Sequence, residues 1–160
     1  MTAIKNAVDK FLQWFCIVIV VLMTFFVTYQ VATRYLFNAP SAISEALARY
    51  LFVWLTMFGG AYVFGKREHM NLNFIRDKCS PKIKTILELI SEFLIVVFAV
   101  MVMIYGGFVY ASKQMIQVDP SLNISMGYIY GSLVLSGVLI LFYFTFNARE
   151  LIKKLTTKGA

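Results

Sequence analysis

The ionisable side chains nearest to the apolar segments of this sequence are the first candidates for chemistry. Glu88 and Glu92 precede the third such segment and, with Lys84, are spaced four residues apart, so the three share one helix face. If that face lies in a membrane, its carboxylates are candidates for proton binding. The spacing also fits an exposed helix face with a Lys84–Glu88 pair, and we favour this interpretation. Because like charges four residues apart repel, we expect Glu92 to meet a cation from another helix or a partner.

The two cysteines and the histidine are the other candidates, for redox or metal chemistry. Cys16 lies within the first apolar segment and Cys79 between the second and third, so they differ in depth and a structural disulfide is not expected. A zinc-type site needs several ligands at suitable spacing, and Cys79 is the only other soft ligand near His69. We interpret His69 as an interfacial or helix-end contact. No nucleophile–base constellation or phosphate-binding loop is recognisable, so we expect neither catalysis nor a cofactor in this chain.

The composition predicts that membrane-spanning helices position these side chains. Hydrophobic residues make up 60% of the 160 positions and charged residues 14%, whereas soluble globular proteins have about 25% charged residues. A disordered chain is excluded because disorder requires low hydrophobicity. The apolar segments are continuous rather than alternating, which argues against a membrane β-barrel and favours helices, whose backbone groups are satisfied internally.

We therefore predict an all-α fold, a single integral membrane domain of residues 1–160 that forms a bundle of four transmembrane helices. The spans are about 11–33, 45–65, 88–112 and 121–148. The second helix is expected to begin earlier, near Ser41 after Pro40, with a short amphipathic start that carries Glu45. Ser80–Pro81 and Asp119–Pro120 each combine an N-cap residue with a proline at the first helical position, and they predict the starts of the last two helices.

Basic residues are distributed unevenly between the predicted loops. Two precede the first span, six lie between the second and third, and four follow the last, whereas the other two loops together carry three. By the positive-inside rule the basic side is cytoplasmic, so we expect both termini inside and the loops at 34–49 and 113–119 outside. The excess positive charge flanks membrane spans without a nucleic-acid-binding motif, so it indicates contact with anionic membrane lipids and not with nucleic acid.

The sequence offers little for a substrate pathway of its own. Secondary transporters usually contain repeated halves with broken helices near the bilayer midplane, and no internal repeat is recognisable here. Gly127 and Gly131, four residues apart, allow close helix approach, either within the bundle or against a partner. Trp54 has an amphipathic ring suited to an interface or a helix contact. These features favour a chain that packs against other helices.

The segment 34–73 carries a more specific pattern, RYLFNAPSAISEALARYLFVWLTMFGGAYVFGKREHMNLN. It resembles the small membrane subunit (Q-type, DctQ-like) of tripartite ATP-independent periplasmic (TRAP) transporters. Those subunits have an Arg-Tyr-x-Phe-Asn segment after the first span, a Ser-Glu-Glu-x-x-Arg-Tyr-like helix start and a His-x-x-x-Asp/Asn ending. Ile43 and Ala46 stand where many members have Trp and a second Glu. The matching residues are Arg34, Tyr35, Phe37, Asn38, Ser44, Glu45, Arg49, Tyr50, Trp54, Gly60, His69 and Asn73.

The resemblance implies a division of labour among three proteins. A large (M-type) membrane subunit carries the substrate and sodium, and a soluble periplasmic substrate-binding protein captures an organic acid such as a sialic acid or a C4-dicarboxylate. The small subunit is then a non-catalytic, multi-pass accessory chain of the bacterial inner membrane, which scaffolds the large subunit and helps to dock the binding protein. The candidate partner contacts are Arg34, Asn38, Glu45, Arg49, Trp54, His69, Glu92, Lys113, Gly127 and Gly131.

Two other classes of protein are the alternatives. A small four-helix exporter that works alone as a homodimer relies on a membrane-embedded carboxylate in its first helix, and the first span contains none. A membrane enzyme or redox protein would need more cysteine and histidine ligands than this chain has. Both alternatives are therefore less favoured than the accessory subunit.

Overall fold

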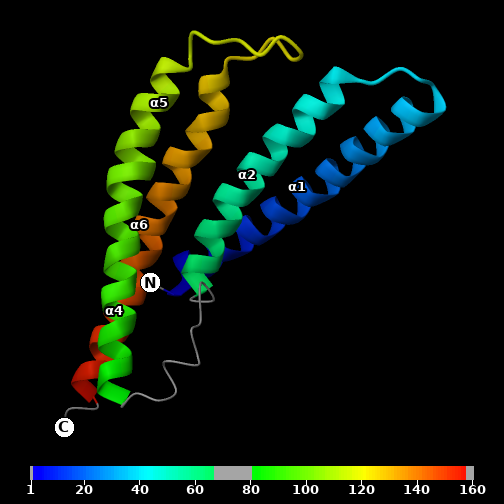
Figure 1. Cartoon of the computed structure of the whole chain (residues 1–160). Coiled ribbons are helices and arrows are strands. Elements are labelled where there is room, and N and C mark those ends of the chain that lie inside the picture. The colour runs from blue at the N-terminus through cyan, green and yellow to red at the C-terminus, as the bar shows by residue number, and fades with distance from the viewer. Residues whose placement is uncertain (1, 67–80, 158–160) are drawn as a thin grey trace.

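The chain folds into long helices that run the length of the molecule (Figure 1). A computed structural model describes residues 2–66 and 81–157. Within them, four helical rods are long and apolar enough to cross a membrane, which confirms the predicted all-α architecture. The elements are α1 (Thr2–Leu36), α2 (Ala42–Lys66), α4 (Pro81–Phe98), the π-helical η1 (Ala99–Gly106), α5 (Gly107–Lys113) and α6 (Met126–Thr157).

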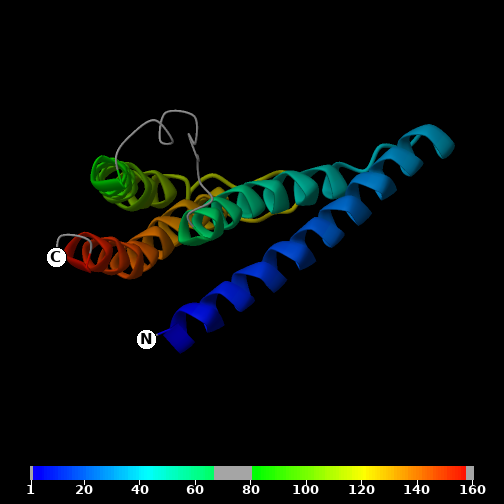
Figure 2. The same cartoon turned by 90° about the horizontal axis from the view of Figure 1, so that it is seen from below.

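The helices pair as two hairpins that meet at one end of the molecule. Helix α1 packs along α2, and α6 packs along the continuous rod formed by α4, η1 and α5. Helix α2 also contacts α6, whereas the outer ends of the two hairpins diverge (Figure 1). Seen from below, α1 lies at the edge of the assembly, away from α4 (Figure 2). The start of α1 and the end of α6 lie at the same end, as an even number of spans requires.

The helix starts predicted near Ser41 and at Pro81 are confirmed. The Ser41 hydroxyl accepts a hydrogen bond from the Ser44 amide at 3.4 Å, so Ser41 acts as the N-cap of α2. Helix α4 begins at Pro81, where proline fits because the first helical amide has no partner within the helix. Helix α1 stops at Leu36 because Asn38 adopts the left-handed conformation (φ 55°), which turns the chain so that the Ala39 amide reaches the carbonyl of Thr33 at 3.2 Å.

The predicted start of the fourth helix at residue 121 is wrong, because α6 begins at Met126. Asp119 does cap backbone amides, those of Ser121 and Leu122, at 2.7 and 3.0 Å. The turn closes instead of continuing as a helix, because Asn123 adopts a left-handed conformation (φ 54°) and its amide donates back to the Asp119 carbonyl. The cap signal was correctly located, but it belongs to a loop.

The core lies where the two hairpins meet. Leu12 of α1, Phe58 and Phe64 of α2, and Tyr143 of α6 are buried together. The rings of Trp54 and Phe58 stack with 5.4 Å between centroids. Trp54 therefore contributes to packing within the chain.

The third rod changes its helical winding in the middle. Residues Ala99–Gly106 form a π-helix, a winding that is rare in runs of this length and is frequent at functional sites. Gly137 of α6 faces this segment so closely that a Cβ there would lie 2.8 Å from Ile104 and 3.1 Å from Met103. Glycine thus lets α6 approach the widened rod, a contact that the small-residue spacing in the sequence did not single out.

Candidate interface for a membrane partner

The most apolar helices of the chain are also the least buried within it. In the most hydrophobic stretches of α1 and of the rod 86–113, only 11% of the residues are buried, compared with 33% in α6. Bulky side chains such as Phe11, Val21 and Phe25 on α1 are more than 60% exposed. Surfaces of this kind are covered either by lipid or by helices of another protein, so these two faces are the candidate interface.

An exposed polar group joins α1 to the start of α2 at the end of the bundle that we expect to face outside. Glu45 forms an ion pair with Arg49 one turn later at 3.5 Å, and it accepts a hydrogen bond from the Gln30 side chain of α1 at 3.3 Å. The Glu45 and Arg49 side chains are 54% and 60% exposed, so the pair contributes little stability, about 0–1 kcal/mol. Both charges remain accessible to a partner.

A second contact at that end connects the two hairpins. The loop between α5 and α6 reaches towards α2 (Figure 1), and the Tyr50 hydroxyl donates a hydrogen bond to the buried carboxylate of Asp119. This bond, the amides of Leu122 and Ser121 and the nearby charge of Arg49 outweigh desolvation and hold the pKa of the Asp119 carboxyl below its usual value. The loop is therefore fastened to α2 by a charged group.

A buried polar cluster fixes the opposite end of the bundle, where the hairpins meet. The Asp9 carboxylate of α1 accepts a hydrogen bond from the Tyr143 hydroxyl of α6 at 2.6 Å and pairs with Lys66 of α2 at 3.1 Å. Asp9 is 8% exposed and Tyr143 is fully buried. The Lys66 ammonium also lies 5.5 Å from the centroid of the Tyr62 ring. A single carboxylate of α1 is therefore bonded to side chains of two other helices, α2 and α6.

Two further residues extend this cluster. The Asn147 side chain of α6 donates to the Phe64 carbonyl of α2 at 3.3 Å and accepts a hydrogen bond from Lys5 of α1 at 3.4 Å. Gly65 packs directly on Tyr143, since a Cβ there would lie 2.5 Å from its ring. The cluster sets the positions of α1, α2 and α6, and so the orientation of the exposed apolar faces.

Sequence reasoning missed Asp9 and its partners. Asp9 precedes the apolar run, which begins at Phe11, so it lies outside the predicted first span. Its partners lie in distant parts of the chain, Tyr143 being 134 residues away, and no local spacing reveals such a contact. The only available signal was an acidic residue within one turn of a membrane span, beside basic neighbours.

The charged and polar residues predicted to contact partners fall into separate regions. Arg34 in the last turn of α1, Asn38 and Lys113 at the end of α5 are exposed at the end that carries Glu45 and Arg49. Glu92 lies in α4 and is only 8% exposed. His69 lies outside the described residues. The structure thus groups five of the predicted residues at one end of the bundle and separates Glu92 from them.

The two glycines of the predicted small-residue pair differ in their surroundings. A Cβ at Gly127 would lie 2.6 Å from the Ala111 carbonyl and 2.7 Å from the sulfur of Met115, so this glycine is required for α6 to pack on α5. A Cβ at Gly131 would meet nothing within 4 Å. Gly127 therefore serves internal packing, whereas Gly131 leaves room on the helix surface.

This arrangement defines a class of protein: a multi-pass membrane chain whose polar groups fasten helices to each other and whose apolar faces remain open. Comparison with known families makes the class specific. Residues 23–154 match the family described as tripartite ATP-independent periplasmic transporters, DctQ component. The chain belongs to this family, as its sequence pattern indicated, and is therefore a small permease subunit of a transporter.

Individual relatives agree with this assignment. A putative TRAP transporter small permease protein of Haemophilus influenzae is 27% identical over 140 residues, which cover 88% of this chain and 86% of the relative. The sialic acid TRAP transporter small permease protein SiaQ of Vibrio cholerae is 33% identical over 115 residues, or 72% of this chain and 66% of that protein. The sialic acid TRAP transporter permease protein SiaT of Haemophilus influenzae is 27% identical over 115 residues, which make up only 18% of its length.

Proposed function

We propose that this chain is the non-catalytic accessory subunit of a sodium-coupled TRAP importer of organic acids in the bacterial inner membrane. In this proposal a large M-type subunit carries the substrate and sodium, and the present chain holds its static part in place. The observation that carries the proposal is the exposure of α1 and of the rod 86–113, which are the most apolar helices of the chain. Two such faces are what a scaffold needs in order to bind another membrane protein along its length.

The match to a much longer permease supports the identity of the partner. In the relative SiaT, a segment similar to this chain occupies 18% of a single polypeptide. The rest of that polypeptide is then the natural counterpart of a large subunit. Because a segment within one polypeptide stays close to the remainder, we propose that the present chain binds a separate large subunit in the same way.

Co-purification tests the proposed complex. A tagged chain, extracted from its native membrane in mild detergent, is expected to retain a large polytopic protein at a fixed ratio. Reconstituting both membrane subunits together with the soluble binding protein, with and without a sodium gradient, then tests coupling by uptake of a labelled sialic acid or C4-dicarboxylate. Absence of a large partner from the purified material would contradict the subunit proposal, and equal uptake in both gradients would contradict sodium coupling.

We further propose that the outer end, with Arg34, Glu45 and Arg49, helps to dock a periplasmic substrate-binding protein. These charges are exposed and lie on the side that the distribution of basic residues predicts to be periplasmic. Exposed complementary charges steer association more than they stabilise a complex. The substrate class, a sialic acid or a C4-dicarboxylate, rests on the family and on the similarity to the sialic acid transporter proteins SiaQ and SiaT.

A charge swap separates docking from internal stability. Glu45→Lys and Arg49→Glu, each alone, break their ion pair, whereas the double substitution restores a pair of the opposite order. We expect all three variants to slow association with the binding protein, measured as the rate at low salt. If the double substitution regains the association rate as well as the pair, these residues act only within the chain.

A further inference from the structure

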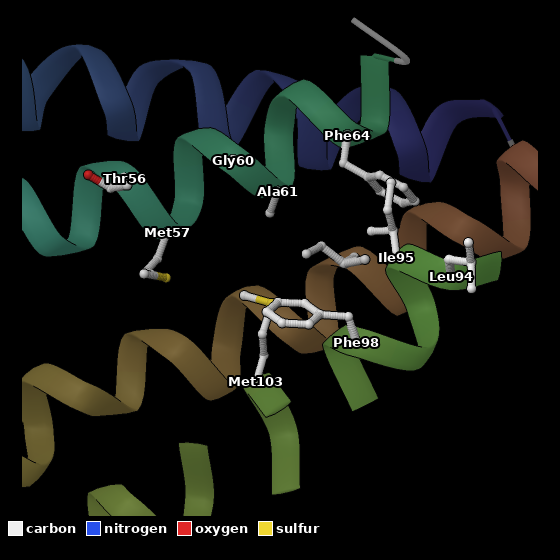
Figure 3. Close-up of a pocket in the computed structure, with 10 residues that line it drawn as sticks. Thr56, Met57, Gly60, Ala61, Phe64, Leu94, Ile95, Phe98 and Met103 are labelled. Carbon is white, nitrogen blue, oxygen red and sulfur yellow. The ribbon is translucent and has the colours of Figure 1, made fainter. Parts of the chain in front are cut away.

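An apolar groove runs along the C-terminal half of α2, between this helix and the rod formed by α4 and η1, with α6 as its floor. Its volume is about 400 Å³. Figure 3 shows Met57 of α2, and Phe98 and Met103 from the facing rod, pointing into this space. Leu94 and Phe98 at its margin are 61% and 55% exposed, so the groove opens to the lateral surface of the bundle.

The lining selects for an apolar occupant. Among the lining residues, Thr56 carries the only hydroxyl, and it donates to the Phe52 carbonyl of its own helix at 2.8 Å. The other lining side chains are aliphatic, aromatic or thioether, so they offer a ligand dispersion contacts. An enclosed apolar cavity of about 150 Å³ is enough to bind benzene, and this groove is more than twice as large.

The size and shape of the groove decide between a helix and a narrower occupant. Its residues on α2 extend from Thr56 to Phe64, which corresponds to about 12 Å along the helix axis. A helix segment of that length, about 10–12 Å across, occupies roughly 1,000 Å³. All the empty space of the groove, open solvent included, is about 850 Å³, so such a segment does not fit inside it. A partner helix can therefore lie over the groove but cannot enter it, whereas a single hydrocarbon chain can.

We propose that the groove binds one acyl chain of a membrane phospholipid, lying parallel to α2. Gly60 makes the site possible, because it lines the groove and a Cβ at this position would meet nothing within 4 Å. The chain fills the space that a larger residue would occupy and completes the packing between the two hairpins. This proposal is independent of the proposed transport function, since it concerns the chain and the bilayer alone.

Photo-crosslinking in native membranes tests the site. Cells that produce the full chain are grown with a palmitate that carries a diazirine in its tail, so that their phospholipids contain the probe. After irradiation, the modified residues are mapped by mass spectrometry. We expect adducts on Met57 and Met103 that survive detergent washing before irradiation, whereas adducts on exposed residues of α1 such as Phe25 disappear with the loosely held lipid.

A matched pair of glycine substitutions provides the control. Gly60→Leu places a side chain in the groove and removes about two methylene contacts from the lipid, so we expect roughly a tenfold loss of retained adducts. Gly59→Leu adds the same side chain on the same helix, in open space outside the groove, and we expect adducts as in the wild type.

Several results would overturn the proposal. Groove adducts that wash away as readily as those on Phe25 would show ordinary lipid contact. Equal retention in Gly60→Leu and Gly59→Leu would mean that the groove is not the site. Cross-links from the groove to another protein in place of lipid would show that a partner fills it. The wild-type adduct map alone decides the question if Gly60→Leu does not accumulate.

Discussion

The hydroxyl of Tyr143 in the last helix donates a hydrogen bond of 2.6 Å to the carboxylate of Asp9 in the first. Lys66 approaches the same carboxylate from the second helix at 3.1 Å. A buried carboxylate needs such partners, because desolvation penalises a charge that is not compensated. This contact therefore links the ends of the sequence and determines how the two hairpins cross.

Removing the Tyr143 hydroxyl is expected to destabilise the bundle. Tyr143→Phe keeps the ring but leaves the Asp9 carboxylate without its buried donor, which costs about 1–3 kcal/mol. The thermal unfolding midpoint in detergent, followed by size-exclusion chromatography with fluorescence detection, measures this loss. Tyr128→Phe is the control, since Tyr128 is 64% exposed on the same helix. Equal midpoints for the two variants would mean that the Asp9 contact does not stabilise the fold.

Gly65 and Gly59 give a second matched comparison. Gly65→Ala brings a methyl group to 2.5 Å from the ring of Tyr143, which is held by its buried hydrogen bond, so overpacking is expected to cost about 1–3 kcal/mol. Gly59→Ala meets no neighbour and is expected to stabilise α2 by up to about 1 kcal/mol. The same unfolding measurement tests both signs, and a stable Gly65→Ala protein would show that Tyr143 can move aside.

The contact between Tyr50 and Asp119 predicts a dependence of stability on pH. The folded protein holds the Asp119 pKa below its usual value of 3.8, chiefly through the bond from Tyr50. A depressed carboxyl pKa adds stability that is fully present above the unfolded-state pKa and is lost as the pH falls through the folded-state value. Asp119→Asn should therefore lower the unfolding midpoint at about pH 7 and narrow its difference from the wild type below about pH 4.

The control for this pH effect is Glu45→Gln, which removes an exposed carboxylate at the same end of the bundle. This substitution should change the free energy of unfolding by less than about 1 kcal/mol. Unfolding is followed from about pH 7 to about pH 3, a range that spans the usual pKa of an aspartate carboxyl. A constant difference between Asp119→Asn and the wild type over this range would contradict the assigned pKa shift.

Gly127 and Gly131 separate internal packing from partner binding. Gly127→Leu collides with the Ala111 carbonyl and Met115, so we expect it to lower the unfolding midpoint of the isolated chain. Gly131→Leu extends into open space and should leave that midpoint unchanged. If the surface at Gly131 contacts the proposed large subunit, this variant should reduce co-purification. Undiminished co-purification would place Gly131 on a lipid-facing surface.

Much of the fold follows from local patterns in the sequence. Continuous apolar runs predict the four rods, and Ser41 and Pro81 mark helix starts because capping is a local interaction. Asp119 carries the same signal but begins a turn, since the left-handed conformation of Asn123 ends it. A capping residue such as Asp119 can be recognised as an acceptor for backbone amides. Its presence does not determine whether the residues after it form a helix or only a turn.

The candidate site was less predictable than the helices. The Glu45–Arg49 pair follows from local spacing, because its partners lie one helical turn apart. Asp9, Lys66 and Tyr143 come together only where three helices cross. The position and angle of that crossing cannot be read from a single sequence. The different roles of Gly127 and Gly131 likewise depend on the helix opposite each of them. Contacts between distant segments therefore required the structure.

The cluster at Asp9 also has a meaning for the order of assembly. Asp9 and Lys66 belong to the first hairpin and are synthesised long before Tyr143, which lies 134 residues after Asp9. Until α6 is inserted, the early hairpin carries an ion pair without its covering ring and hydroxyl. A truncated chain therefore exposes the Asp9–Lys66 ion pair at the end where the hairpins meet. Insertion of the last helix covers this pair with Tyr143. The same three residues that fix the crossing of the helices thus distinguish a finished subunit from an unfinished one.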